Sequence, residues 1–137
     1  MEECIFCKIV EGKIPASKVY ENKGILAFLD ISPANYGHVL VIPKKHFKNM
    51  QEITEEYLYE IMKAVKKIAP AILKAMNMPS FNVILSNGKD AGQEVAHIHF
   101  HIIPQSSENK IQINLPHKKY EDGKMRRVAE RIKKEIK

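Results

Sequence analysis

Residues 97–103, HIHFHII, carry three histidines at alternate positions. The segment has the composition of a β-strand, and side chains alternate between the two faces of a strand. His97, His99 and His101 are therefore expected on one face, with the apolar residues between them on the other. Because each buried imidazole requires a polar partner, packing alone does not explain three of them together. The spacing predicts that one face of this strand does chemistry.

Two kinds of chemistry suit three imidazoles on one face. They could hold a catalytic metal with an open coordination position, as in zinc hydrolases. Alternatively, one neutral imidazole could attack phosphorus while its neighbours bind phosphate and act in acid-base steps. Residues 87–93, NGKDAGQ, favour the second chemistry, because their two glycines permit close approach of backbone N–H groups to phosphate oxygens. A metallohydrolase stays open as an alternative.

The pair Cys4-x-x-Cys7 requires a separate interpretation. This spacing occurs in redox pairs, in metal sites and by chance. A redox pair of the thioredoxin type follows a strand, and no strand is expected before Cys4. Zinc needs two further ligands to complete a tetrahedron, for which His46 and His97 are the candidates. We favour a metal site over a redox pair.

The composition is that of an ordinary globular protein. The chain has 137 residues, of which 45% are apolar and 28% are charged, so one domain over residues 1–137 is expected. No apolar run approaches the roughly 20 residues of a membrane-spanning helix. The N-terminal sequence MEECIFCKIVEGK lacks the pattern of a secretory signal. We expect a cytoplasmic protein without a membrane partner.

The net charge of +6 is concentrated at one end of the chain. Residues 118–137 contain nine Lys or Arg and four Asp or Glu, a balance of +5. Apolar residues recur there near helical spacing, at Met125, Val128, Ile132 and Ile136. We interpret this tail as an amphipathic helix with a solvated basic face, and we expect no specific nucleic-acid partner.

The elements that must position these residues follow from the apolar pattern. Thr54 is expected to cap a long helix that reaches Met76, with a kink or break at Pro70. Strands are expected at residues 18–21, 24–30, 38–42, 81–86 and 97–103. Short connections between consecutive strands predict an α+β fold, with an antiparallel sheet of about five strands, a long helix and a C-terminal helix.

The ordered motifs resemble those of the histidine triad (HIT) family. The family signature, His-φ-His-φ-His-φ-φ with φ apolar, is complete at residues 97–103, and AGQEVA precedes it. Further similar segments are CIFCKIVEGKIPASKVYEN from Cys4 and AFLDISPANYGHVLVIPKKH at residues 27–46. The chain looks most like the small bacterial and archaeal members of the Hint branch. The resemblance implies a HIT-like fold, a homodimer, and chemistry at the α-phosphate of purine nucleoside phosphoramidates or related nucleotides.

The resemblance also implies roles for individual residues. His99 matches the family's nucleophile, which forms a nucleotidyl-histidine intermediate that water resolves, and His101 matches a phosphate-contacting histidine. Asp30 matches the residue that binds the ribose hydroxyls, a role that suits a carboxylate. The positions that match the purine pocket are Ile14, Phe28, Leu29 and Ile31, and those that match the phosphate-binding segment are Asn87, Gly92, Gln93, Glu94 and Val95.

Two positions depart from the family pattern. Glu94 stands where many Hint relatives have Ser or Thr, and a carboxylate beside phosphate repels it. Ser86 and Asn87 straddle the position where relatives place a polar amide, so either could serve.

The resemblance supports the metal site as well. Some bacterial relatives carry a structural zinc on positions that match Cys4, Cys7, His46 and His97. His97 would then orient the strand without taking part in catalysis, and no catalytic metal is expected.

Together these observations predict a HIT-type nucleotide hydrolase or nucleotidyl transferase with a purine nucleotide as its small-molecule partner. The alternative is a non-catalytic, purine-nucleotide-binding regulatory protein, because binding and catalysis would use much the same residues.

Overall fold

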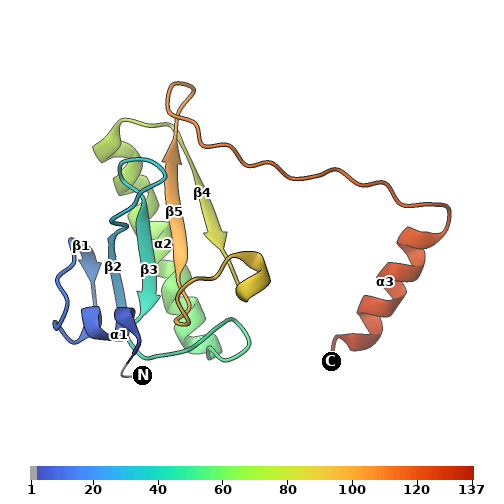
Figure 1. Cartoon of the computed structure of the whole chain (residues 1–137), viewed down its shortest axis with the longest axis horizontal. Helices are drawn as coiled ribbons and strands as arrows, with labels where there is room; N and C mark the ends of the chain where they lie inside the picture. Colours follow the sequence, from blue (N-terminus) through green and yellow to red (C-terminus); the bar gives the residue numbers. More distant parts are fainter. Residues whose placement is uncertain (1–2) are drawn as a thin grey trace.

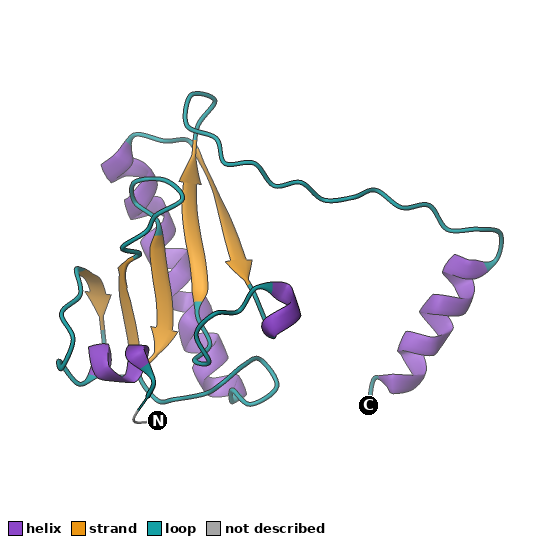
Figure 2. Ribbon diagram, in the orientation of Figure 1, coloured by secondary structure: helices purple, strands orange, loops and turns teal. Residues whose placement is uncertain are grey.

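The computed structural model describes residues 3–137 and shows the predicted α+β fold (Figures 1 and 2). Five strands form one antiparallel sheet in the order β1-β2-β3-β5-β4. The strands are β1 (Lys18–Glu21), β2 (Ile25–Leu29), β3 (Val39–Pro43), β4 (Ser80–Leu85) and β5 (Phe100–Gln105). The helices are α1 (Ile5–Val10), α2 (Glu55–Met76) and α3 (Lys124–Glu135), with a short 3-10 helix, η1 (Lys89–Ala91).

Helix α2 covers one face of the sheet (Figure 1). Its buried side chains recur at three- and four-residue spacing and pack against apolar residues of β2, β3 and β5. The side chain of Thr54 accepts a hydrogen bond from the backbone N–H of Tyr57, which confirms the predicted N-cap. Ile98, Phe100 and Ile102 belong to this core. The apolar half of the histidine segment therefore anchors it to the helix.

The predicted break at Pro70 is wrong, because α2 continues through this residue without interruption. Proline removes the hydrogen bond that its N–H would donate to the carbonyl of Lys66. Both residues lie on the exposed side of the helix, where water can bind the freed carbonyl. The buried stripe on the other side is unaffected.

Helix α1 covers part of the opposite face and was not predicted. Its buried residues Phe6 and Ile9 pack in a second apolar cluster with Phe28, Leu40 and Ile42 of the sheet. Cys4 is the N-cap of this helix, and its sulfur accepts a hydrogen bond from the backbone N–H of Cys7. The helix therefore brings the two cysteines to the same end of α1.

The strand predicted at residues 97–103 begins only at Phe100. His97 and His99 precede it, because the backbone N–H of Ile98 donates to Phe47 O at 2.8 Å instead of to a neighbouring strand. The alternation of side chains nevertheless continues through this irregular stretch. Ile98 faces the α2 core, while the rings of His97 and His99 contact Phe6 on the other side.

The C-terminal part of the chain lies apart from the sheet. Residues 106–123 contain no helix or strand, and α3 stands away from the body of the molecule at the end of this segment (Figure 1). The predicted amphipathic helix is confirmed from Lys124 to Glu135, and none of its residues is buried. Among residues 3–137, no helix combines the length and apolarity required to cross a membrane.

Candidate active site and metal centre

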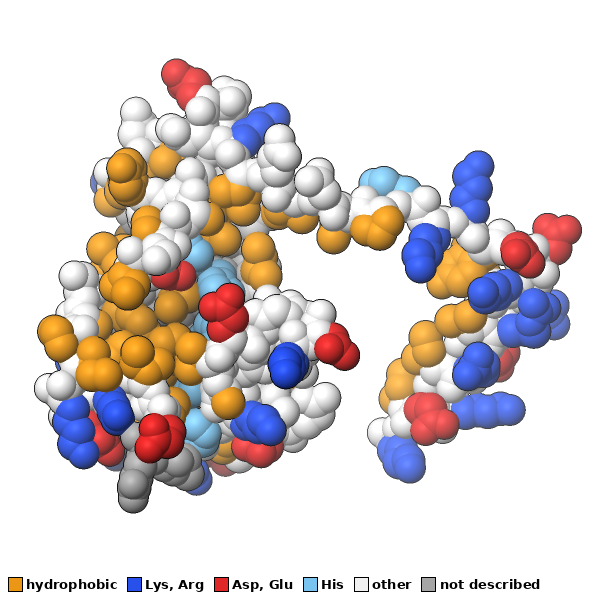
Figure 3. Space-filling model, in the orientation of Figure 1, with side chains coloured by type: hydrophobic (Ala, Val, Ile, Leu, Met, Phe, Trp, Pro, Cys, Tyr) orange, Lys and Arg blue, Asp and Glu red, His pale blue; other side chains and the backbone are white. Residues whose placement is uncertain are grey.

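A cavity of about 730 Å³ opens on the sheet face opposite α2. Its walls come from α1 and the segment after it, from β2 and β3, and from the loop before the histidine segment. On this face of the molecule, histidine side chains border a broad apolar area (Figure 3). The cavity thus joins an apolar region to imidazole groups, which suits a ligand with an aromatic base and a phosphate.

Most of the residues predicted to bind or transform a nucleotide line this cavity. The structure places there Ile14, Phe28, Leu29, Asp30, Ile31, Gly92, Glu94, Val95, His99 and His101. Segments far apart in the sequence thus meet around one space.

Asn87 and Gln93 are placed differently, because their side chains hold the loop together. Asn87 accepts from the backbone N–H of Met50 at 2.7 Å and donates to the Gln51 side chain at 3.1 Å. The Gln93 amide donates to Lys48 O and Val95 O at 2.8 and 2.9 Å and accepts from the Gly88 N–H at 2.8 Å. Neither side chain is among the groups that line the cavity. A phosphate contact from Gln93 would therefore come from its backbone.

Ser86 does line the cavity. Of the two neighbours considered for the polar position before the loop, Ser86 rather than Asn87 faces the site.

The orientation of His99 leaves one ring nitrogen free for chemistry. Its Nδ1 lies 2.8 Å from the carbonyl oxygen of His97. Because a carbonyl only accepts, Nδ1 carries a proton, so in the neutral form of the ring the lone pair is on Nε2. Phe6 packs edge-on against the ring at 5.1 Å between centroids. These contacts hold a buried imidazole in one orientation at the cavity wall.

His101 pairs with a histidine that was not predicted to belong to the site. His38 Nε2 lies 2.9 Å from His101 Nδ1, and the backbone N–H of Ala34 donates to His38 Nδ1 at 3.0 Å. Burial lowers the pKa of His38, while Asp30 raises it by a smaller amount. Burial, followed by the charges of His99 and His38, lowers the pKa of His101 to about 4. Both rings are therefore neutral near pH 7.

The sequence does contain a signal for His38. It immediately precedes a strand, and Leu40, two residues later, pairs directly with His101 on β5. Strand alternation places His38 and Leu40 on one face. The missing information was that β3 and β5 are neighbours in the sheet.

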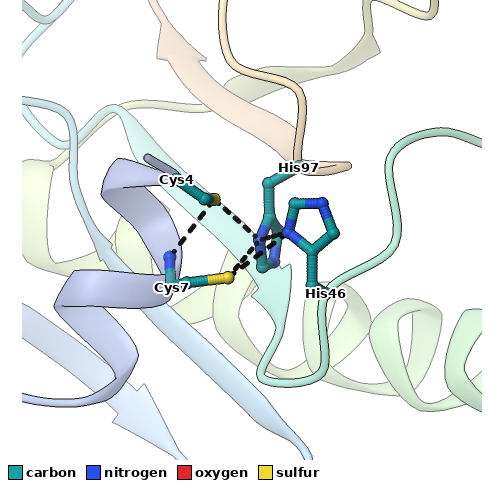
Figure 4. Close-up of side chains that lie close together, drawn as sticks. All are labelled: Cys4, Cys7, His46 and His97. Atoms are coloured by element: carbon teal, nitrogen blue, oxygen red, sulfur yellow. Dashed lines mark hydrogen bonds between the residues drawn. The ribbon is translucent and has the colours of Figure 1, made fainter. Parts of the chain in front are cut away.

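The four predicted zinc ligands converge at one end of α1 (Figure 4). Cys4 Sγ lies 3.4 Å from His97 Nδ1, and Cys7 Sγ lies 3.3 Å from His46 Nδ1. The Nδ1 atoms of His46 and His97 are 3.2 Å apart, and all four ligand atoms lie within 4.8 Å of one another. The ligands come from α1, from the turn after β3 and from the segment before β5.

This geometry and donor set fit zinc. Bond lengths of about 2.3 Å to sulfur and 2.0 Å to nitrogen place tetrahedral ligand atoms roughly 3.3 to 3.8 Å apart. His97 Nε2 donates to Pro43 O at 2.8 Å, so its Nδ1 carries the lone pair that a metal requires. Burial lowers the pKa of His97 to about 4, which keeps the ring neutral. Burial, followed by Cys4, raises the pKa of the Cys7 thiol to about 11, so a thiolate there requires a cation beside it.

Comparison with known proteins identifies the family. The HIT domain model matches residues 11–108. The chain belongs to the histidine triad family. The adenosine 5'-monophosphoramidase of Saccharomyces cerevisiae is 47% identical to this HIT protein over 105 residues, which cover 77% of the present chain and 64% of the yeast protein.

Solved structures of HIT proteins agree with the fold. A member of the family from Bacillus subtilis superposes with a TM-score of 0.91 at 40% identity, over 98% of each chain. A zinc-bound histidine triad family protein from Mycobacterium smegmatis superposes with a TM-score of 0.78 at 32% identity, over 97% of each chain. The fold predicted from the sequence is thus that of known HIT proteins.

Proposed function

We propose that this HIT protein is a nucleotide hydrolase that acts at the α-phosphate of purine nucleoside phosphoramidates or related nucleotides. The observation that carries the proposal is the orientation of His99. Its Nδ1 is bound to His97 O, so the lone pair of the neutral ring is on Nε2 at the cavity wall. The names of relatives, such as the yeast adenosine 5'-monophosphoramidase, support nucleotide hydrolysis as the general activity.

The proposed reaction has two displacement steps. In the first, His99 Nε2 attacks the α-phosphorus, a P–N bond to the ring forms, and the bond to the leaving amine breaks as the amine takes a proton from solvent water. In the second, water attacks the same phosphorus and gives up a proton to the solvent, the bond to His99 breaks, and the nucleoside monophosphate is released.

The cavity offers a place for each part of such a substrate. Apolar residues of its wall, including Phe28 and Leu29, would hold the base, and Asp30 would accept hydrogen bonds from the ribose hydroxyls. His101 and the backbone of the loop at Gly92 would contact the phosphate.

Trapping the intermediate tests this proposal. Rapid quenching during turnover of adenosine phosphoramidate should show a mass increase of one nucleoside monophosphate on His99. A regulatory protein that only binds purine nucleotides would bind AMP with no adduct and no turnover. A metallohydrolase, for which Asp30, His38 and His101 offer converging ligand atoms, would lose activity on complete chelation, whereas the histidine route would not.

We also propose that zinc has a structural role at Cys4, Cys7, His46 and His97. The ion would supply the positive charge that holds two thiolates and would cross-link α1 to the segments on either side. His97, whose Nδ1 is directed to this cluster, would then position the backbone carbonyl that orients His99.

The active form is proposed to be a homodimer. Strand β4 lies at one edge of the sheet, and Phe81 and Val83 on it are each 41% exposed. An open edge with apolar side chains favours association with a second copy. Light scattering at micromolar concentration should give twice the chain mass, and a monomer mass would contradict the dimer.

A further inference from the structure

We propose that Cys4 and Cys7 form a redox modification site, at which hydrogen peroxide converts the two zinc-bound thiolates to a disulfide and the zinc is released. The proposal rests on the zinc site proposed above. Its effect on turnover rests also on the proposed nucleotide hydrolysis, whereas the modification itself does not.

The two sulfur atoms are placed to react with each other. Cys4 is the N-cap of α1 and Cys7 lies in its first turn, so both side chains are at the same end of the helix (Figure 4). The backbone N–H of Cys7 donates to Cys4 Sγ at 3.4 Å, and the two sulfurs belong to the four ligand atoms that lie within 4.8 Å of one another. A disulfide brings two sulfurs to about 2 Å. The bond therefore requires a movement of a few ångströms within one short segment.

The sulfur side of the cluster is the side that solvent reaches. Cys4 and Cys7 are the only cysteines of the chain, and both are partly exposed and free of disulfides. His97, on the interior side, is 0% exposed. A small oxidant from solvent thus meets the sulfurs first, and one disulfide consumes every thiol of the protein.

The step is a two-electron oxidation of sulfur. One thiolate attacks an oxygen of hydrogen peroxide, the O–O bond breaks, and a sulfenic acid and a hydroxide form. The other thiolate attacks that sulfur, the S–O bond breaks, and a disulfide and a second hydroxide form. Both anionic ligands are then lost, and zinc leaves as a divalent cation because the two remaining imidazoles do not complete a tetrahedron. A thiol reductant returns the two electrons and reverses the reaction.

Loss of the ion weakens the attachment of α1 to the sheet. Among the described residues, the backbone hydrogen bonds of residues 4–14 join only residues of that same segment. What holds α1 to the rest of the molecule is therefore the cluster and apolar packing, in which Phe6 and Ile9 are buried. A disulfide within α1 replaces neither of the links to the two histidines.

Phe6 connects α1 to the proposed nucleophile. It lies between the two cysteines in the sequence, is 6% exposed and lines the cavity. Its ring packs edge-on against the rings of His97 and His99, at 5.9 and 5.1 Å between centroids. A displacement of the first turn of α1 therefore moves a ring that supports His99. The oxidation state of the sulfurs is in this way transmitted to the cavity.

Zinc release, disulfide formation and the surroundings of His99 can be measured on the same zinc-loaded, full-length protein. Hydrogen peroxide is added in small molar excess, and a chromogenic chelator measures the released zinc. Intact mass reports a disulfide as a loss of about 2 Da. The Cε1 proton resonance of His99 reports movement of the Phe6 ring, with His117, an exposed histidine of the C-terminal segment, as the internal reference.

Cys4→Asp is the matched variant. Aspartate is a strong N-cap, and its carboxylate is a zinc ligand, so both α1 and the metal site are expected to be kept. The remaining cysteine has no partner for an intramolecular disulfide. The variant retains all six methionines, so it also reports any effect of methionine oxidation.

In the wild-type protein we expect one zinc released for every two thiols lost, together with the mass of a disulfide. Tm should fall by at least about 5 °C, and the His99 resonance should shift while that of His117 stays unchanged. Turnover of adenosine phosphoramidate should fall by about 3- to 10-fold, because His99 loses a positioning contact. Dithiothreitol with added zinc should reverse these changes. Cys4→Asp should keep its zinc and its Tm in the same peroxide.

Three results would overturn the proposal: zinc and both thiols retained in excess peroxide, a disulfide that forms with zinc still bound, or zinc release that dithiothreitol and zinc do not reverse. Equal release from Cys4→Asp would also contradict it, and an unchanged His99 resonance would rule out transmission to the cavity. A protein that cannot be loaded with zinc would remove both the zinc site and this inference. If no nucleotide is turned over, the proposed function fails, and the zinc and mass measurements still decide the modification.

Discussion

The metal cluster and the cavity use histidines that stand only two residues apart, yet they present opposite nitrogens. At the cluster, His97 Nε2 donates to Pro43 O, which leaves Nδ1 for a metal. At the cavity, His99 Nδ1 donates to His97 O, which leaves Nε2 for the substrate. In each case one backbone carbonyl determines which nitrogen is free. The side-chain type is the same, and the hydrogen bond on the far side of the ring sets the chemistry.

The two regions also differ in the ionisable groups that they present. The cluster combines two thiols with two imidazoles. The cavity wall contains the carboxylates of Asp30 and Glu94, and no Lys or Arg is among the described residues that line it. The thiols of the cluster can ionise to bind a cation, whereas the carboxylates at the cavity oppose a phosphate. The comparison therefore predicts different responses to mutation at the two places.

The largest effect is expected at His99, the proposed nucleophile. His99→Ala should remove the covalent route, and its loss of turnover should exceed that of His101→Ala, for which about 10² to 10⁴-fold is expected from loss of a positioned phosphate donor. AMP affinity should change little, because Asp30 and the apolar wall remain. Single-turnover hydrolysis and intact mass measure both variants. Retention of more than about a tenth of wild-type turnover by His99→Ala would contradict the assignment.

Removal of the proposed zinc should lower the thermal stability of the protein without abolishing nucleotide binding. Chelation is expected to lower Tm by at least about 5 °C, because the proposed metal would cross-link α1 to the sheet. Nucleotide binding at 25 °C should persist, since the groups proposed to contact the nucleotide are distinct from the proposed zinc ligands. Elemental analysis and thermal unfolding test this, with Cys7→Ser as a variant whose Tm should not respond to chelator. Less than about 0.2 zinc per chain in protein purified without added metal, with freely reactive thiols, would rule out the site.

Substitution of Glu94 is expected to have a smaller effect, and to raise activity instead of lowering it. Glu94 lines the cavity, so loss of its carboxylate in Glu94→Ser should reduce repulsion of the phosphate and raise kcat/KM on adenosine phosphoramidate by a factor of a few. Glu108→Ser removes an equal charge from an exposed position beyond β5 and should have no effect. An unchanged or lower value in Glu94→Ser would show that the carboxylate points away or already assists the reaction.

The smallest effect is a pH dependence of stability that originates at the cavity. The pKa of His101 is lowered from 6.5 to about 4, so as the pH falls this side chain is protonated in the unfolded chain at a higher pH than in the folded protein. His101 therefore favours folding above pH 6.5, and this contribution is lost as the pH falls from 6.5 towards 4. Urea unfolding at pH 7 and pH 5 should show a smaller loss of stability in His101→Gln than in the wild type. Equal losses would mean that His101 is readily protonated in the folded protein.

The C-terminal helix shows what a local sequence pattern can and cannot predict. The spacing of Met125, Val128 and Ile132 predicted an amphipathic helix, and α3 is one. The pattern could not say where the helix would lie, because an apolar stripe of this length specifies no partner. In the structure α3 has no buried residue and stands apart from the sheet.

The sequence by itself determined the five strands, the two longer helices and the face on which the histidines lie, because alternation in a strand and three- and four-residue spacing in a helix are local properties. The five-stranded antiparallel sheet and the cap at Thr54 followed from such patterns. The strand boundary at Phe100 did not, since the N–H of Ile98 is used by Phe47 O, far away in the sequence.

Only the tertiary structure decided which nitrogen of each imidazole is free. Pro43 O, His97 O and the N–H of Ala34 are backbone groups, so their residue types carry no signal of the bonds they make. The pairing of β3 with β5 brings His38 to His101, and strand order is not a local property of either segment. Residue spacing identified the imidazoles, and hydrogen bonds to backbone groups, both near and far along the chain, assigned each one its chemistry.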